Sequence, residues 1–289
     1  MILRSIDDGA TWKQRAVGGA PDLDFRGIAA FDVTTAFVMS SGNGDKSRIY
    51  KTQDGGSVWA LQYSGTSPAV FLDSIVCESA TSCLALSDPG DGKFVVLSTA
   101  DGSHWKDLPR DKTPATLPNE GAFAASGSSL AICDGGENIY FGTGGASSAR
   151  VFRSRDRGLS WTVADTPVAS GNASSGIFSI ACGQGTLVAV GGDYKDGEKS
   201  DRVSAYSSDL GTTWHLAEKQ PRGYRSSVTQ IADGVFLAVG PNGADIGRST
   251  SKTLNWEAAV DGNFNALASD DGKTWAVGPK GTIATFAPR

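Results

Sequence analysis

The stretch Ser154-Arg155-Asp156-Arg157-Gly158-Leu159-Ser160-Trp161 is one copy of an eight-residue phrase that recurs along this chain of 289 residues. Further copies end at Trp12, Trp59 and Trp214, and two decayed copies end at Trp105 and Trp256. From Trp12 to Trp256 the intervals are 47, 46, 56, 53 and 42 residues, about the length of a four-stranded propeller blade with its loops. The repeat therefore predicts an all-β propeller of four-stranded antiparallel blades.

The sequence pattern of the repeat is Ser/Thr-x-Asp-x-Gly-x-Thr/Ser-Trp, and it follows from the physics of tight turns. Asp accepts hydrogen bonds from nearby backbone N–H groups, Gly adopts the positive φ that such a loop needs, and Trp fills the gap between neighbouring blades. We therefore expect these side chains to be structural and not catalytic. They are Asp7, Gly9, Trp12, Asp54, Gly56, Trp59, Asp156, Gly158, Trp161, Asp209, Gly211 and Trp214. Because the last copy is decayed, we expect Trp256 to contribute less to stability than Trp161.

Between the repeats, short apolar runs follow one another in the order of strands A, B, C and D. We expect strand A to begin at Phe25, Phe71, Ala122, Ile177, Tyr224 and Phe264, and residues 270–272 to be a hairpin between A and B. The expected blades are residues 1–19 (partial), 20–64, 68–109, 119–167, 174–219, 223–260 and 262–289 of a single domain, residues 1–289. The first blade lacks strands A and B, and the last lacks D. Two interpretations stay open: an incomplete first blade of a seven-bladed propeller, or an irregular six-bladed closure.

The phrase is the Asp-box, or BNR repeat, of sialidase-type and sortilin-type propellers. With the runs Gly44–Thr52, Gly121–Gly127, Ala149–Ser154 and Val190–Tyr194, the chain resembles bacterial propellers related to the photosystem II assembly and stability factors. The resemblance implies seven blades of WD40/YVTN-like architecture, an exported or periplasmic location and a binding scaffold. The photosynthetic members of this family are assembly factors that bind a membrane-protein partner.

Composition and charge narrow the classes of partner. The net charge is −5 with no basic run, which argues against nucleic acid. No stretch has the apolar length of a membrane span, and no signal-peptide pattern opens the chain. The only two histidines, His104 and His215, each lie next to a repeat tryptophan, so we expect no metal site. We also expect no cofactor and a monomer.

The four cysteines divide into a pair and two single residues. Cys77 ends a strand A and Cys83 opens the strand B that follows it, so the two could form a disulfide in an oxidising compartment. Their Cα atoms would then lie about 4.4–6.8 Å apart. Cys133 and Cys182 end equivalent A strands, and we interpret them as filler.

Polar side chains recur where strand A begins and where strand B ends. Both points lie at the same end of a blade, near the central channel and opposite the Asp-boxes. We therefore expect Arg26, Asp73, Glu120 and Arg225 to surround one channel mouth, where they could bind an acidic group. The alternative is that these residues pair with one another and line a water-filled channel. The full candidate ligand-binding set is Arg26, Asp73, Glu120, Arg225, Asn265, Asp193 and Tyr194.

Three functional classes compete for this chain. The sequence favours a non-catalytic, assembly-factor-like propeller that recognises a protein or an acidic small ligand, because no complete catalytic constellation is present. A sialidase-like glycoside hydrolase or lyase is the alternative; it would use Arg26, Arg225, Glu120, Asp73 and Tyr194 or Tyr224. A redox enzyme comes last, because the chain contains neither Gly-x-Gly-x-x-Gly between a strand and a helix nor Cys-x-x-Cys.

Overall fold

The computed structural model describes residues 2–286 except residues 184, 251 and 271. The chain divides into two compact units, Met1–Pro109 and Arg110–Arg289, called unit 1 and unit 2 below. The expectation of a single domain stays a prediction, and each unit is described by itself.

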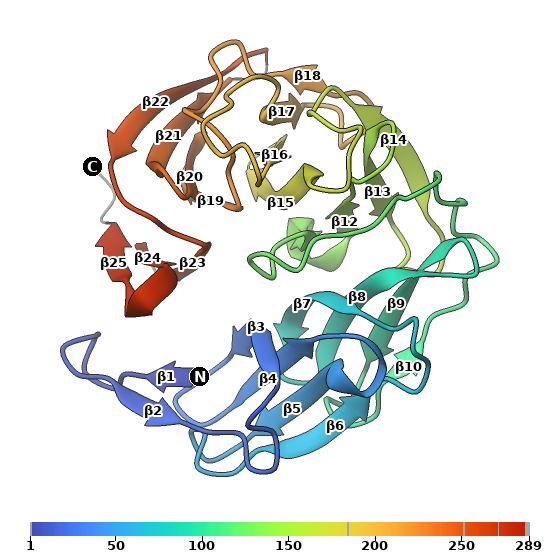
Figure 1. Ribbon diagram of the computed structural model, residues 1–289, viewed down its shortest axis with the longest axis vertical. Helices are drawn as coiled ribbons and strands as arrows, with labels where there is room; N and C mark the ends of the chain where they lie inside the picture. The colour runs from blue at the N-terminus through green and yellow to red at the C-terminus, as the bar shows by residue number, and fades with distance from the viewer. Residues whose placement is uncertain (1, 184, 251, 271, 287–289) are drawn as a thin grey trace. The chain divides into compact units, whose positions relative to one another are not determined.

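Unit 1 contains three antiparallel sheets (Figure 1). The first has two strands, and the other two have four strands each, in sequence order. The strands are β1 (Ile2–Arg4) and β2 (Lys13–Arg15); β3 (Asp24–Ala30), β4 (Ala36–Ser41), β5 (Arg48–Thr52) and β6 (Ala60–Ser64); and β7 (Leu72–Ser79), β8 (Ser82–Gly90), β9 (Lys93–Thr99) and β10 (Lys106–Asp107). A 3-10 turn, η1 (Gly44–Lys46), links β4 to β5.

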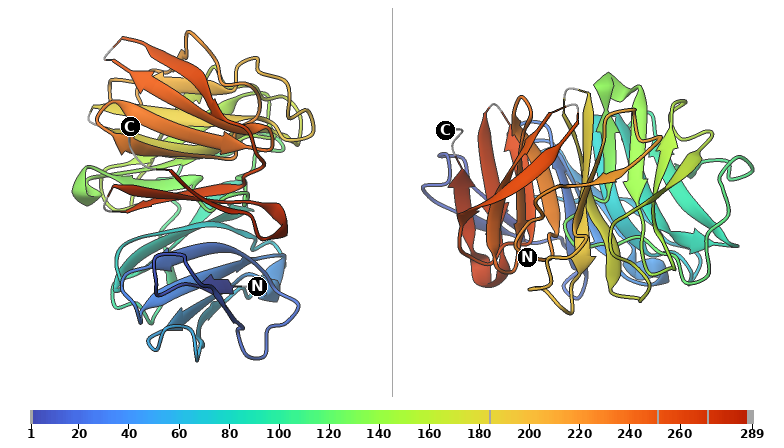
Figure 2. Two further views of the ribbon diagram at one scale, coloured as in Figure 1. Left: turned by 90° about the vertical axis from the view of Figure 1, so that its left-hand side faces the viewer. Right: turned by 90° about the horizontal axis from the view of Figure 1, so that it is seen from above.

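Unit 2 contains three four-stranded antiparallel sheets and one three-stranded sheet. The strands of the sheet β19–β22, drawn in orange, lie side by side in Figure 1 and in both views of Figure 2. The first two sheets are β11 (Leu130–Cys133), β12 (Asn138–Gly142), β13 (Ala149–Ser154) and β14 (Thr162–Thr166); and β15 (Ser175–Gly183), β16 (Thr186–Asp193), β17 (Ser204–Ser207) and β18 (His215–Leu216). The others are β19 (Ser227–Ala232), β20 (Val235–Gly240), β21 (Gly243–Ser249) and β22 (Leu254–Val260); and β23 (Ala266–Asp270), β24 (Lys273–Val277) and β25 (Ile283–Phe286), with 3-10 turns η2 (Asp134–Gly136) and η3 (Pro279–Gly281).

The fold is an all-β propeller of four-stranded antiparallel blades. In the described part of the chain, five four-stranded sheets and the three-stranded sheet β23–β25 make six blades, the alternative that the sequence had left open. The hairpin β1–β2 is the short sheet expected at the start of the chain. Asp270 pairs with Lys273 between β23 and β24, as expected for a hairpin there, although residue 271 lies outside the described residues.

The hydrophobic core lies between successive sheets of each unit. In unit 1, Phe37 and Met39 of β4 pack in one cluster with Leu72 and Ile75 of β7. In unit 2, Val188, Tyr206, Phe236 and Trp256 form an equivalent cluster from two successive sheets. Strands buried on both faces read as continuous apolar runs, because neighbouring blades cover each side.

The Asp-box turns form the hydrogen bonds that their residue pattern predicts. In the box that ends at Trp161, the Ser154 hydroxyl donates to Asp156 (2.8 Å) and accepts from the N–H of Gly158 (2.8 Å). Trp161 Nε1 donates to the carbonyl of Gly158 (3.0 Å), whose φ is 86°. The same bonds recur in the boxes that end at Trp12 and Trp214. These three boxes are therefore turns closed by their own side chains.

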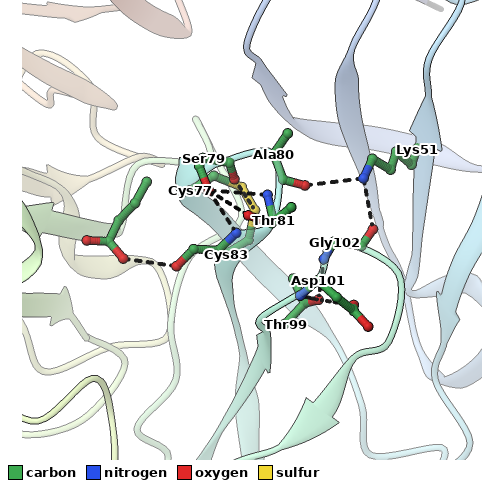
Figure 3. Close-up of a disulfide and its surroundings, with 11 residues drawn as sticks. Lys51, Cys77, Ser79, Ala80, Thr81, Cys83, Thr99, Asp101 and Gly102 are labelled. Atoms are coloured by element: carbon green, nitrogen blue, oxygen red, sulfur yellow. Dashed lines mark hydrogen bonds between the residues drawn. A yellow bond between two sulfur atoms is a disulfide. The ribbon is translucent and has the colours of Figure 1, made fainter.

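The residue before a box joins its blade to the next. Lys51 Nζ donates to the carbonyl oxygens of Ala80 (3.2 Å) and Gly102 (3.3 Å), which belong to the A–B turn and the decayed box of the following blade (Figure 3). Tyr206, at the matching position in unit 2, donates to the carbonyl of Lys252. The Lys51 bonds reach the A–B turn and the decayed box of the following blade, and the Tyr206 bond reaches the loop between β21 and β22. This end of the blades is called the box end below, and the opposite end, where A strands begin, the A-start end.

One expectation from the sequence was wrong in detail. Strand A of the blade that contains β12 begins at Leu130 and not at Ala122, because the small and polar residues 125–129 favour a loop over a strand. Trp256 lies inside β22, is 1% exposed and donates from Nε1 to the Ser204 hydroxyl (2.9 Å). The decay of its box has therefore not loosened its packing.

Candidate functional site

The A-start ends of unit 1 carry a register feature that places polar side chains. The pairing of β3 with β4 skips Arg26, and the pairing of β7 with β8 skips Asp73. A β-bulge of this kind adds one residue and redirects its side chain. The bulges put Arg26 and Asp73 at matching positions of neighbouring blades, near the start of strand A in each.

Asp73 is a buried carboxyl group without a hydrogen-bond partner. Asp73 is 1% exposed, and neither of its carboxylate oxygens has a hydrogen-bond partner among the described residues. Burial raises the pKa of Asp73 well above its ordinary value, Asp88 raises it further, and Arg26 partly offsets both. Asp73 therefore favours the protonated, uncharged form.

Arg26 lies in a different environment from Asp73. Its guanidinium forms an ion pair with Asp24 (2.7 Å), and the two side chains are 42% and 60% exposed. Exposed pairs of this kind stabilise a fold by at most about 1 kcal/mol. Arg26 is thus the accessible cation of the predicted set.

Glu120 lies in a buried ion pair of unit 2. Arg150 Nε donates to Glu120 Oε1 (2.8 Å), and Arg150 Nη2 donates to the other carboxylate oxygen. The Thr143 hydroxyl and the N–H of Leu117 complete the shell (2.7 and 2.8 Å). Glu120 lies in the loop before β11 and is 6% exposed. Its charge fastens this loop to β13 and does not face solvent.

Arg225 is likewise engaged inside unit 2. The residue is 0% exposed, and its Nε and Nη2 both donate to Asp245, the former at 2.7 Å. Asp245 also accepts from Arg222 (3.1 Å), whose Nη1 donates to the exposed Asp261 (2.7 Å). Burial lowers the pKa of Arg225 and Asp245 opposes that shift, but an arginine stays charged throughout. Arg225 is therefore bound on the inside, which leaves no free guanidinium for a ligand.

The predicted ring joins residues of both units. Arg26 and Asp73 belong to unit 1, and Glu120 and Arg225 belong to unit 2, so their common position around one mouth stays a prediction. Asn265 precedes β23 and is exposed, while its backbone carbonyl accepts from the Ser226 hydroxyl (2.7 Å).

Asp193 and Tyr194 lie together at the A-start end of unit 2. Asp193 accepts from the Asn172 amide (3.1 Å) and from the N–H of Lys195 (3.0 Å). Tyr194 donates its backbone N–H to the carbonyl of Ser174 (3.2 Å), and its side chain is half exposed. Tyr194 is therefore held by the backbone while its ring stays accessible.

An aromatic cluster supports Tyr194 from below, and the sequence analysis missed it. The Phe178 ring stacks on Phe123 (3.9 Å between centroids) and meets Tyr224 (4.8 Å) and Tyr194 (6.1 Å) edge to face. These four residues come from four separate segments and define the Tyr194 surface. Phe123 is partly exposed, whereas Phe178 and Tyr224 are buried.

Phe178 could have been found from the strand register. The pairing of β15 with β16 skips Phe178, as the earlier blades skip Arg26 and Asp73. An aromatic residue therefore replaces a charged one at the matching position in unit 2.

All four cysteines are paired in disulfides. Cys77 and Cys83 lie opposite each other on β7 and β8, with Cα atoms 4.0 Å apart, closer than the expected range (Figure 3). Cys133 and Cys182 are joined as well, with Cα atoms 5.9 Å apart. The interpretation of these two as filler was wrong, because equivalent positions of adjacent blades lie side by side. This disulfide links the end of β11 to the end of β15.

The described residues contain neither a metal-binding cluster nor a membrane-spanning helix. No group of three or more His, Cys, Asp or Glu side chains there could hold a metal ion. None of the helical segments in that part of the chain is long and apolar enough to cross a membrane.

Comparisons with known proteins point to solved structures alone. No family model and no curated protein matches this chain. It is similar to YCF48 bound to a D1 peptide, with 16% identity over 93% of this chain and 79% of that one, and a TM-score of 0.58. YCF48 from Cyanidioschyzon merolae is 13% identical over 96% and 85% of the two chains, with a TM-score of 0.59.

An ancestral GH74 enzyme gives a similar score with less coverage. It is 14% identical, with a TM-score of 0.60 over 95% of this chain but only 38% of the enzyme. At these identities the likeness concerns the fold and not the site. The chain shares the β-propeller fold of YCF48 and of part of a GH74 enzyme.

Proposed function

We propose that this chain is a non-catalytic propeller that binds a segment of a partner protein on the Tyr194 surface. The observation that carries the proposal is a half-exposed tyrosine at the A-start end of unit 2 whose ring contacts Phe178, which in turn packs against Phe123 and Tyr224. Tyrosine supplies a large, stiff contact area with a polar tip, and such residues dominate binding energy at interfaces. A supported and accessible ring is therefore a suitable anchor.

The surroundings of Tyr194 add polar groups suited to a peptide. The Asp193 carboxylate is fixed by Asn172 and by the N–H of Lys195. Glu198, in the same loop, accepts from the Asn242 amide (3.3 Å). Interfaces combine an aromatic centre with a polar rim of this kind. Orientation of the bound segment would come from these groups, and most of the affinity from the aromatic centre.

The ion pairs of unit 2 disfavour the hydrolase alternative. Glycosidases use a pair of carboxyl groups that face the substrate, and sialidase-like chemistry also needs free guanidinium groups. Glu120 is enclosed by Arg150, and Arg225 is enclosed by Asp245. Neither side chain has the solvent access that the reaction requires.

The structural neighbours give the proposal a precedent. YCF48, a propeller of similar fold, is known bound to a D1 peptide. The two disulfides of this chain add a condition, because disulfides persist in oxidising compartments. The partner would accordingly be met in such a compartment.

A site-specific cross-linker tests the proposal. Replacing Tyr194 with a photoreactive phenylalanine analogue in the producing cells should yield an adduct to one segment of one protein. The same analogue at Leu216, an exposed residue of β18 at 38%, serves as the matched control. Adducts that are identical at the two positions, or no adduct at position 194, would refute the proposal.

A further inference from the structure

The Asp-boxes differ in how they use the second carboxylate oxygen of the aspartate. In the boxes of Asp7 and Asp209, a threonine four residues later donates its hydroxyl to Oδ2 (2.5 and 2.6 Å). Ser160 does the same for Asp156, and the His104 imidazole contacts Asp101 Oδ2 (2.7 Å) in a decayed box. A side chain thus covers this oxygen in four boxes.

The box of Asp54 departs from this rule. Asp54 Oδ1 accepts from the Thr52 hydroxyl and from the N–H groups of Ser57 and Val58, each at 2.9 Å. The residue at the covering position is Val58, which has no hydroxyl to donate and is 66% exposed. Within the part of the chain that the structure describes, no protein group donates to Asp54 Oδ2. The turn is therefore closed, yet one carboxylate oxygen is left for solvent or a ligand.

Asp54 also lines a groove. It has a volume of about 260 Å³ and runs between the Asp54 box and the next blade. That volume is slightly below the roughly 300–1,000 Å³ of ordinary small-molecule sites. The groove, called the Asp54 groove below, is lined among others by Lys51, Gln53, Asp54, Val58, Gln62 and Ser103.

The charges in the Asp54 groove cancel. Hydrogen bonds from the N–H of Val58 and from Thr52 lower the pKa of Asp54, so its carboxylate is ionised at neutral pH. The Lys51 ammonium lies nearby, held by the carbonyls of Ala80 and Gly102 (Figure 3). A ligand with a net charge would be attracted by one group and repelled by the other. A neutral ligand with several hydroxyl groups faces no such conflict.

The remaining lining groups suit hydroxyls and C–H surfaces. Gln62 donates its amide to the Ala60 carbonyl (3.0 Å), which leaves its side-chain oxygen as an acceptor. The Gln53 amide and the Ser103 hydroxyl can each donate or accept. Val58 adds an apolar wall. A sugar ring presents this combination of hydroxyl edges and C–H faces.

We propose that the Asp54 groove binds a single neutral sugar ring, one hydroxyl of which donates to Asp54 Oδ2. The groove lies at the box end of unit 1, whereas the Tyr194 surface lies at the A-start end of unit 2, so the proposal is independent of the proposed function. Val58 is the residue that makes this box differ from the others, because it leaves the carboxylate oxygen uncovered.

Two variants of Val58 distinguish the hydrogen bond between the sugar and Asp54 Oδ2 from the apolar contact between the sugar and Val58. Val58→Thr restores the residue found at the matching position of the Asp7 and Asp209 boxes, and should cover Asp54 Oδ2. Val58→Ala removes both γ-methyl groups and supplies no hydroxyl. Since threonine already occupies this position in two boxes, we expect Val58→Thr to fold.

The experiment is a titration of the whole chain with D-glucose, D-galactose and D-mannose, followed by amide chemical shifts at Val58, Gln62 and Ser103. We expect saturable shifts for at least one sugar, an affinity at least about tenfold weaker in Val58→Thr, and a change of only a few-fold in Val58→Ala. The proposal is overturned if no sugar gives saturable shifts, if Val58→Thr binds like the wild type, or if both variants lose binding equally. Saturable binding of tetramethylammonium in place of the sugars would also overturn it.

Discussion

The two units differ in whether the buried charged residues at their A-start ends have hydrogen-bond partners. In unit 2, Arg225 and Asp245 are both buried and satisfy each other, with Arg222 as a second partner of the carboxylate. In unit 1, Asp73 is equally buried but has no hydrogen-bond partner among the described residues. Similar polar residues near the same end of a blade can thus be a structural ion pair in one place and an isolated acid in another.

The difference shows how the pairing of a buried charged residue affects whether it can bind a ligand. A paired buried charge is fixed and unavailable for a ligand, whereas removal of its partner leaves an uncompensated charge. An isolated buried carboxyl avoids that cost by holding its proton. Asp73, Glu120 and Arg225 are all buried, whereas Arg26 is exposed, and the anchor that we propose in unit 2 is aromatic.

The largest expected effects concern two buried tryptophans. Trp161→Ala and Trp256→Ala should each reduce the free energy of unfolding by about 3–5 kcal/mol, since each removes a buried ring. Trp161 is 6% exposed and Trp256 is 1% exposed, so we expect no smaller loss for Trp256. Chemical denaturation measures both, and a clearly smaller loss for Trp256 would restore the view that box integrity tracks packing.

Disruption of the Arg225 pair should cost nearly as much. Arg225→Ala leaves Asp245 with Arg222 as its remaining cation, and we expect a loss of about 3 kcal/mol in the free energy of unfolding. Arg26→Ala removes an exposed ion pair and should change the same quantity by at most about 1 kcal/mol. Equal losses in the two variants would show that burial does not separate these arginines.

The two disulfides should differ in proportion to the loops that they close. Cys133 and Cys182 are separated by 49 residues and Cys77 and Cys83 by 6, so loop entropy predicts contributions of about 4 and about 2 kcal/mol. Paired Cys→Ser variants, compared by denaturant unfolding, measure each contribution. A larger loss for the short loop would contradict the entropic explanation.

Asp73→Asn should have the smallest effect, and one that depends on pH. A group whose pKa is raised in the folded state contributes stability at low pH, and this contribution is lost as the pH rises through the raised pKa. The charged groups that shift this pKa are Asp88 on β8, which raises it, and Arg26 on β3, which lowers it, while β4 contains no titratable side chain. The variant should therefore match the wild type near pH 4 and be increasingly more stable than it at higher pH.

Melting temperatures recorded from pH 4 to pH 9 would show this divergence. Parallel curves for Asp73→Asn and the wild type would mean that Asp73 finds a partner in solution.

The repeat was enough to predict the blades, because each Asp-box is a local turn whose bonds join residues at most four positions apart. The boxes ending at Trp161 and Trp214 form these bonds as spelled. The pairing of charges was not predictable from the sequence. Arg225 meets Asp245 twenty positions away and Glu120 meets Arg150 thirty positions away, and several other acids were available to each.

Strand register explains the other errors. Phe178 is a bulged residue of β15, and the aromatic cluster was missed because its members come from four segments. The disulfide between Cys133 and Cys182 was missed for a similar reason, since it depends on which blades are neighbours. Contacts between repeats require a register that composition does not supply.

The most direct test of the proposed function is the affinity for the cross-linked partner segment, prepared as a peptide. Tyr194→Ala should weaken Kd at least about 30-fold, the effect of losing an anchor worth about 2 kcal/mol. Tyr194→Phe should change it by only a few-fold, and both variants should keep the melting temperature of the wild type. An unchanged Kd in Tyr194→Ala would contradict the proposal that this surface binds the partner.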